Sequence, residues 1–183
     1  MSRPETVARR RARWAVDGET ARLQLKLGAV IIDASDLDLV SDFSWHCKPQ
    51  LPDAVYAITS MLVNGKPRTV PMHRLIMGAQ PGHPAIDHKN SNGLDNRREN
   101  LRSCTQSQNM GNARKSPSRV CHSNYKGVSF DKRGGWRAMI YCDGKRNSLG
   151  YFDTEKEAAR AYDLAARRHF GSFARLNFPG EAA

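Results

Sequence analysis

One short segment of this chain carries residue types that could do chemistry, at fixed spacing. Asp87 and His88 are adjacent, Asn100 follows Asp87 by 13 positions and Asn109 follows it by 22. Carboxylate and amide oxygens bind hard divalent cations, and a neutral imidazole can accept a proton from water near physiological pH. These are the groups that metal-assisted hydrolysis of a phosphodiester needs. An Asp-His pair in a loop is also common as a hydrogen-bonded turn, so the surrounding elements have to decide between the two interpretations.

Turn residues and polarity predict the elements around the pair. Pro81-Gly82 and Asn92-Gly93 are breakers on either side of it, which indicates two thin strands joined by a loop. Residues 105–113 are polar, and we expect a helix there that holds Asn109 and Asn112. Asn112 lies on a similar face of that helix, because it follows Asn109 by three residues. We predict that Asn112 contacts phosphate or lies on the surface, in preference to acting as a third metal ligand.

Residues 85–112 resemble the His-Asn-His (HNH) endonuclease family, in the branch of phage and intron-encoded homing nucleases where an Asn replaces the last His. The resemblance rests on Asp87-His88, Asn100-Leu101 and Asn109 in that order. It implies a ββα-metal fold, with Asp87 and Asn109 as ligands of a divalent cation and His88 as the general base. Asn100 would be catalytic by orienting the histidine, although a turn or cap Asn has the same appearance. Oxygen ligands suit Mg²⁺, the expected ion, or Mn²⁺ better than zinc.

The residues before this motif predict a strand-rich lead-in. A short helix is expected over 72–77, in which His73 packs in the core and Arg74 is a candidate phosphate contact. The Asn64-Gly65 pair predicts a hairpin turn, because it accepts the positive φ values that such turns require. Further strands are expected at 23–25, 29–32 and 55–58, with a helical turn at 36–40.

The last third of the chain has the clearest patterning. Residues 136–141 alternate between two faces, with Trp136 on the side expected to pack against a helix. Asp143-Gly144 predicts a turn, and Thr154-x-x-Glu157 is a capping box for a helix over 156–170. The expected strands are 126–130, 136–141 and 146–150.

This pattern resembles the APETALA2-type DNA-binding domain, which is known from plant transcription factors and also follows the nuclease core in HNH homing endonucleases. The resemblance spans 124–179 and rests on the segments 125–128, 149–152, 157–163 and 176–179 with Trp136 between them. It implies that the sheet face opposite the helix enters the major groove of DNA, although its arginines could also form a merely solvated face. The expected DNA contacts are Lys126, Ser129, Arg133, Arg137, Met139, Tyr141, Arg146 and Ser148, with Arg114 and Lys115 from the preceding basic linker.

Composition supports a nucleic-acid partner. Lysine and arginine total 29 against 18 aspartate and glutamate residues, a formal net charge of +11 that attracts polyanions. No apolar run approaches the length of a membrane span, so we expect no membrane partner. The four cysteines include no Cys-x-x-Cys pair, and Cys121-His122 alone is a weak metal signal. We therefore expect a reduced, intracellular protein of a bacterium or phage-infected host, without a small-molecule cofactor.

Together these patterns predict an α+β protein. A strand-rich lead-in and a ββα-metal core precede a three-stranded antiparallel sheet packed on one helix. The expected function is metal-dependent nicking or double-strand cleavage of double-stranded DNA by a homing-type endonuclease, as a monomer or a homodimer. A DNA-binding regulator with a remnant nuclease core is the alternative, and an RNA-binding protein is less favoured. The expected parts are a basic arm (1–20, in contact with DNA or a solvated tail), an HNH domain (21–112, core 85–112), a basic linker (113–123) and an APETALA2-like domain (124–179).

Overall fold

The computed structural model describes residues 13–50, 54–63, 65–80, 82–115, 123–132 and 134–181. Two compact units make up the chain, the first Met1–His83 with Asn92–Arg102 and the second Pro84–Ser91 with Ser103–Ala183. The domain limits drawn from the sequence stay a prediction. No helix among the described residues is long and apolar enough to cross a membrane. Several residues named above lie outside the described ranges: 1–12 of the arm, Asn64, Pro81, 116–122 of the linker with Cys121 and His122, and Arg133.

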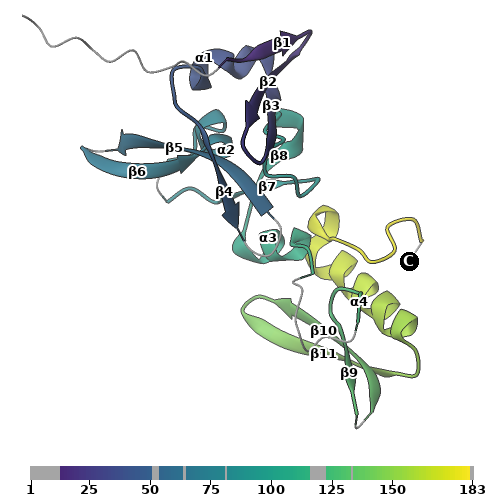
Figure 1. Ribbon diagram of the computed structural model, residues 1–183. Coiled ribbons are helices and arrows are strands. Elements are labelled where there is room, and N and C mark those ends of the chain that lie inside the picture. Colours follow the sequence, from purple (N-terminus) through teal and green to yellow (C-terminus); the bar gives the residue numbers. More distant parts are fainter. Residues whose placement is uncertain are drawn as a thin grey trace, which may run out of the picture. The chain divides into compact units, whose positions relative to one another are not determined.

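Two antiparallel three-stranded sheets form most of the first unit, as the strand-rich pattern predicts (Figure 1). The first sheet has the order β1-β2-β3 and the second the order β4-β5-β6. Their bounds are β1 (Ala15–Asp17), β2 (Thr20–Leu25), β3 (Gly28–Asp33), β4 (His46–Gln50), β5 (Ala54–Val63) and β6 (Lys66–Pro71). The short helices of this unit before the motif are η1 (Ala34–Asp36), α1 (Leu37–Val40) and α2 (Met72–Ile76).

The residues of α2 are used structurally. His73 is 8% exposed, and its ring packs against Tyr56 with the ring centroids 5.5 Å apart. The Arg74 guanidinium donates a hydrogen bond to the carbonyl oxygen of Gln80 at 2.9 Å. His73 is therefore a core residue, as predicted, and Arg74 holds the chain that leaves α2.

A strand, a loop, a second strand and a short helix follow one another across the motif. β7 (Ala85–His88) pairs with β8 (Leu101–Cys104), η2 (Arg98–Asn100) leads into β8, and α3 (Gln106–Asn112) follows it. Thr105 begins α3 through a capping box: its hydroxyl accepts from Gln108 N at 3.2 Å, and Gln108 Oε1 accepts from Thr105 N at 2.9 Å. Because this cap satisfies two amides at the helix start, the polar segment forms a helix at the place predicted.

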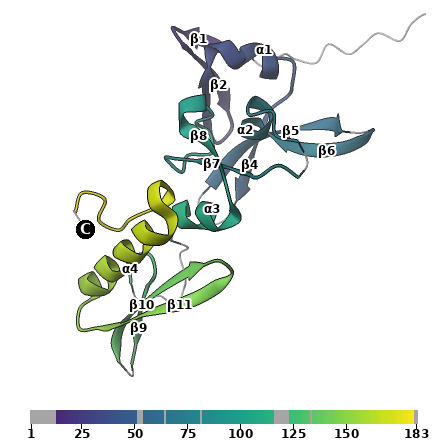
Figure 2. The same cartoon turned by 180° about the vertical axis from the view of Figure 1, so that it is seen from behind.

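The rest of the second unit is a three-stranded antiparallel sheet with one long helix across it (Figures 1 and 2). Asp143 and Gly144 form the turn between two of its strands, with φ values of +50° and +76°. Thr154 and Glu157 make the predicted capping box at the start of the helix. The elements are β9 (Val128–Asp131), β10 (Gly135–Cys142), β11 (Lys145–Phe152), α4 (Glu155–Phe170) and η3 (Gly171–Phe173), and the sheet order is β11-β10-β9.

The alternation along β10 produces the core of this module. Ala138 and Ile140 are buried against the helix, and Trp136 packs at the edge of the same core, as predicted. Gly127 has φ +75°, and a Cβ there would lie 2.0 Å from Cδ2 of Tyr162. Only glycine therefore allows the chain to pass so close to that ring. The α+β fold class predicted from the sequence is confirmed.

Candidate functional site

Asp87 and His88 end β7, and both are buried, with exposed fractions of 6% and 4%. Asn112, the last residue of α3, contacts both of them. Its Nδ2 donates to Asp87 Oδ1 at 2.8 Å, to Asp87 Oδ2 at 3.1 Å and to the carbonyl oxygen of His88 at 2.9 Å. One amide group thus holds the carboxylate of one candidate residue and the backbone of the next.

The predicted surface position of Asn112 is wrong, because only 7% of this residue is exposed. α3 packs against β7, and its last turn faces the strand. A short polar helix has no apolar stripe from which its buried side could be predicted. The sequence feature that could have predicted its position is the three-residue spacing from Asn109, which places both side-chain amides on one side of the helix.

Asn109 is partly exposed and lies one turn before Asn112. Because residues three apart are neighbours on a helix surface, Asn109 lies on the side of α3 that Asn112 turns toward Asp87. No hydrogen bond joins the Asn109 side chain to any residue within the described ranges. Its amide oxygen is thus a suitable donor to a cation beside the Asp87 carboxylate.

The kinds of ligand atom at this site decide which metal ion it fits. Within the described part of the chain, no three or more His, Cys, Asp and Glu side chains gather in a group that could hold a metal ion. A zinc centre of the usual kind thus lacks its ligands there. The carboxylate of Asp87 and the amide oxygen of Asn109 are hard oxygen donors. They fit Mg²⁺ or Mn²⁺, which keep several waters and also bind substrate phosphates.

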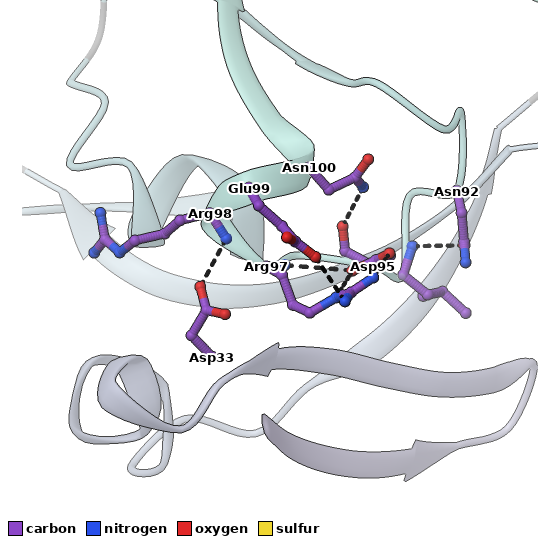
Figure 3. A network of polar contacts seen from close by, with 8 residues as sticks. Asp33, Asn92, Asp95, Arg97, Arg98, Glu99 and Asn100 are labelled. Carbon is purple, nitrogen blue, oxygen red and sulfur yellow. Dashed lines mark hydrogen bonds and ion pairs between the residues drawn. The ribbon is translucent and has the colours of Figure 1, made fainter. Parts of the chain in front are cut away.

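Asn100 belongs to the first unit, where it is buried and closes the turn before β8 (Figure 3). Its Nδ2 donates to the carbonyl oxygen of Asp95 at 2.7 Å, and its backbone N–H donates to the carbonyl oxygen of Arg97 at 2.9 Å. These contacts agree with the turn position that the sequence left open for it. A role in orienting His88 stays a prediction.

Hydrogen bonds to carboxylates fasten the same turn to β3, through Asp33 (Figure 3), and to η1, through Asp36. The Arg98 backbone N–H donates to Asp33 Oδ2 at 2.8 Å, and the Arg98 guanidinium donates to both carboxylate oxygens of Asp36 at 2.7 to 3.0 Å. The Arg97 guanidinium donates to both oxygens of Asp95 at 2.9 and 2.8 Å. These hydrogen bonds to carboxylates raise the pKa of both arginines. The strand-rich lead-in thus supports part of the motif directly.

The C-terminal sheet turns a second set of polar side chains away from its buried face. In β10, Arg137 stands between Ser129 and Tyr151 in register, and its guanidinium lies over the Tyr151 ring at 5.8 Å from the centroid. The sequence missed Tyr151, which is 50% exposed. A register shift after Ala138 explains the omission, because simple alternation along β11 from Arg146 would turn Tyr151 inward. The predicted members of this face also include the cross-strand pairs Met139 with Ser148 and Tyr141 with Arg146.

Two lysines expected to contact DNA donate to backbone carbonyl oxygens of the protein, and their DNA contacts stay a prediction. Lys126 Nζ donates to the carbonyl oxygens of Met110 and Gly111 at 3.1 and 2.5 Å, at the end of α3. Lys115 Nζ donates to the carbonyl oxygen of Tyr125 at 2.7 Å. Both lysines precede β9, so strand alternation does not govern their direction. The other predicted contacts are Ser129, Arg137, Met139, Tyr141, Arg146, Ser148 and the exposed Arg114, together with Arg133, which is not among the described residues.

A two-stranded sheet with an Asp-His pair, followed by a short helix that carries asparagines, defines a protein of the ββα-metal class, here joined to a sheet-and-helix module. Comparison with known proteins agrees. The HNH endonuclease family matches residues 71–111, and the AP2 domain family matches residues 123–172. An uncharacterized HNH endonuclease of Acanthamoeba polyphaga mimivirus is 31% identical over 139 residues, which cover 76% of this chain and 69% of the viral protein. The chain therefore belongs to the HNH endonuclease family and carries a C-terminal AP2 domain.

Plant proteins named for the AP2 domain match shorter stretches of the chain. An AP2/ERF and B3 domain-containing protein of Oryza sativa subsp. japonica is 52% identical over 61 residues, or 33% of this chain and 17% of the plant protein. An AP2-like ethylene-responsive transcription factor of Arabidopsis thaliana is 45% identical over 73 residues, or 39% of this chain and 15% of its own length. The chain thus spans less than a fifth of either plant relative. No solved structure matches the chain significantly.

Proposed function

We propose that this protein is a metal-dependent DNA endonuclease of homing type, with Asp87 and Asn109 as metal ligands and His88 as general base. One observation carries the proposal: the Asn112 amide holds both the Asp87 carboxylate and the His88 backbone. A site that is to position a reacting water needs its groups fixed in this manner. The match of the HNH endonuclease family to residues 71–111 supports the same function.

In this mechanism the residues of the chain bind, orient and accept a proton. His88, in its neutral form, takes the proton of the attacking water. Asp87 and Asn109 offer one negative charge and one neutral oxygen, so much of a divalent charge is left for the substrate. When bound, the cation would act as a Lewis acid on the scissile phosphate and stabilise the leaving 3′-oxygen. Asn112 keeps the Asp87 carboxylate from turning away.

The AP2 domain supplies DNA affinity in this proposal. Its sheet face would enter the major groove, where Arg137 can donate to base edges and the stacked Tyr151 ring limits the directions that Arg137 can take. The name of the Arabidopsis relative, a transcription factor, supports a DNA-binding role. Phosphate contacts from the basic chain, with its net charge of +11, would make the affinity fall steeply as salt rises.

A plasmid assay tests the proposal. Supercoiled plasmid that carries the DNA neighbouring the gene is incubated with the protein and Mg²⁺, and nicked and linear products are quantified. We expect cleavage that stops in chelator and falls by roughly 10²–10⁴-fold in His88→Ala, with DNA binding unchanged. Cleavage in chelator, or a fully active His88→Ala protein, would refute the mechanism. DNA binding without cleavage would favour the alternative of a regulator with a remnant nuclease core.

A further inference from the structure

α3, the helix that carries Asn109 and Asn112, rests on residues 123–181 of its own unit, called the AP2 part because the AP2 domain family matches 123–172 within it. Gly111 is buried and lies against Phe170, the last residue of α4. A Cβ on Gly111 would lie 2.6 Å from Phe170 Cγ and 2.9 Å from Cδ2. Side chains do not pack at such distances, so the backbone of α3 sits directly on an aromatic ring that belongs to the AP2 core.

Two residues of the AP2 part fasten the end of α3. Lys126 Nζ donates to the carbonyl oxygens of Met110 and Gly111, and the backbone N–H of Arg175 donates to Gly111 as well, at 3.1 Å. Carbonyl groups at the end of a helix lack partners within the helix and carry partial negative charge, so a cation suits them. Burial lowers the pKa of Lys126 to about 8, which agrees with a side chain that has left water for this contact.

Arg175 also reaches the turn that follows β7. Its Nη1 donates to Ser91 Oγ at 2.7 Å, and the Ser91 backbone N–H donates to the carbonyl oxygen of His88 at 2.8 Å. Lys126 is itself fixed in the AP2 part, because its backbone N–H donates to Asn177 Oδ1 at 2.7 Å. Lys126 and Arg175 thus connect the AP2 part to both elements that hold the candidate catalytic residues.

We propose that the AP2 domain fixes where the DNA is cut, and that Lys126 and Arg175 are positioning residues that hold α3 and β7 in one body with the recognition sheet. The inference rests on the proposed function and extends it. A catalytic site tethered only by a linker would reach many phosphates and would cut over a range of positions. A packed contact allows one geometry, so the cut falls at one distance from the bound sequence.

The test compares cut positions with footprints for the full-length protein. DNA selected by binding is cleaved in Mg²⁺, the ends are mapped by sequencing, and the protected bases are mapped in parallel. The Lys126→Met/Arg175→Ala variant removes the two side-chain contacts, that of Lys126 with the end of α3 and that of Arg175 with Ser91, and the Lys126→Arg variant keeps a cation. In a third variant, about six Gly and Ser residues are inserted between residues 116 and 122, which lengthens the tether alone. Arg167→Ala is the matched control, since the Arg167 guanidinium donates to the carbonyl oxygen of Glu181, away from α3.

Wild type, the insertion variant, Lys126→Arg and Arg167→Ala should each give one cut position per footprint. The double variant should keep its footprint and cut at several positions. A spread of cuts in the insertion variant, or a single position in the double variant, would overturn the proposal. If no variant cuts at all, the proposed function fails, and hydrogen exchange of the amides of 106–113 decides the contact: faster exchange in the double variant supports the contact, and unchanged exchange refutes it.

Discussion

Two segments of the nuclease motif are held in place by different chemistry. The turn 95–100 in the first unit is held by arginine–carboxylate pairs, in which the Asp36 side chain is 4% exposed and its partner Arg98 is 50% exposed. α3 in the second unit is held by a neutral amide, a glycine packed on Phe170 and one half-buried lysine. The first segment therefore depends on paired charges, and the second on close packing together with hydrogen bonds from one amide and one lysine.

The difference predicts how each segment fails. An exposed ion pair contributes little to stability, but removing the partner of a buried carboxylate leaves a charge that water cannot reach well. A packed glycine responds to volume and hardly to salt or charge. At the turn, the contribution of the buried charge is therefore measured by a double mutant that removes both partners. At Gly111, the contribution of packing is measured by a change in side-chain size.

The largest effect on stability is expected at Arg98. Arg98→Met leaves the Asp36 carboxylate buried without its guanidinium, and we expect a loss of about 2–4 kcal/mol in the free energy of unfolding, below the usual cost for a fully buried pair because Arg98 is half exposed. The Asp36→Leu/Arg98→Met double variant should recover most of this loss. Urea unfolding of both proteins measures it. Equal losses in the two variants would mean that the charge of Asp36 is not what Arg98 compensates.

A smaller effect is expected at Gly111. Gly111→Ala puts a methyl group into Phe170, and we expect a loss of about 1–3 kcal/mol, since overpacking forces a shift of the helix or the ring. Gly180→Ala is the matched control, because a Cβ there meets nothing within 4 Å. Thermal unfolding compares the two. If Gly111→Ala were as stable as the control, α3 would not rest on Phe170.

The smallest effect is a dependence on pH at Lys126. Its pKa is lowered to about 8 by burial, whereas the unfolded chain has the ordinary value of 10.5. The unfolded state then binds more protons between these values, so the free energy of unfolding should rise with pH, by about 1 kcal/mol between pH 8 and 9. The measured quantity is the difference between wild type and Lys126→Met, because other groups titrate in both. An equal slope for the two proteins would contradict the assigned burial.

Local sequence patterns were sufficient for much of the fold. The polar segment 105–113, the capping box at Thr154 and the alternation along 136–141 depend on neighbours in the chain, and each structural element that they predict is present. The β-bulge after Ala138 breaks the period of two, so Tyr151 was missed on the outer face. The alternation of residues along one strand does not reveal a register shift, because that shift arises between two paired strands.

The direction of isolated polar side chains was not predictable from the sequence. Lys126 was expected to contact DNA because of its matching position in the APETALA2-type domain, and Lys115 because it lies in the basic linker. Their partners are backbone carbonyls that tertiary packing brings to them, as with the carbonyls of Met110 and Gly111 for Lys126. Asn112 was misplaced for the same reason, since its acceptor Asp87 lies 25 residues away in the sequence.

The central claim is that the Asn112 amide holds Asp87 and His88 in a working nuclease site. The most direct test is the single-turnover cleavage rate of Asn112→Ala in saturating Mg²⁺, with DNA affinity and folding measured on the same protein. We expect DNA binding like that of wild type and a rate lower by about 10–100-fold, the order found when a group that orients a metal ligand is lost. An Asn112→Ala protein that folds, binds DNA and cuts at the wild-type rate would contradict the account.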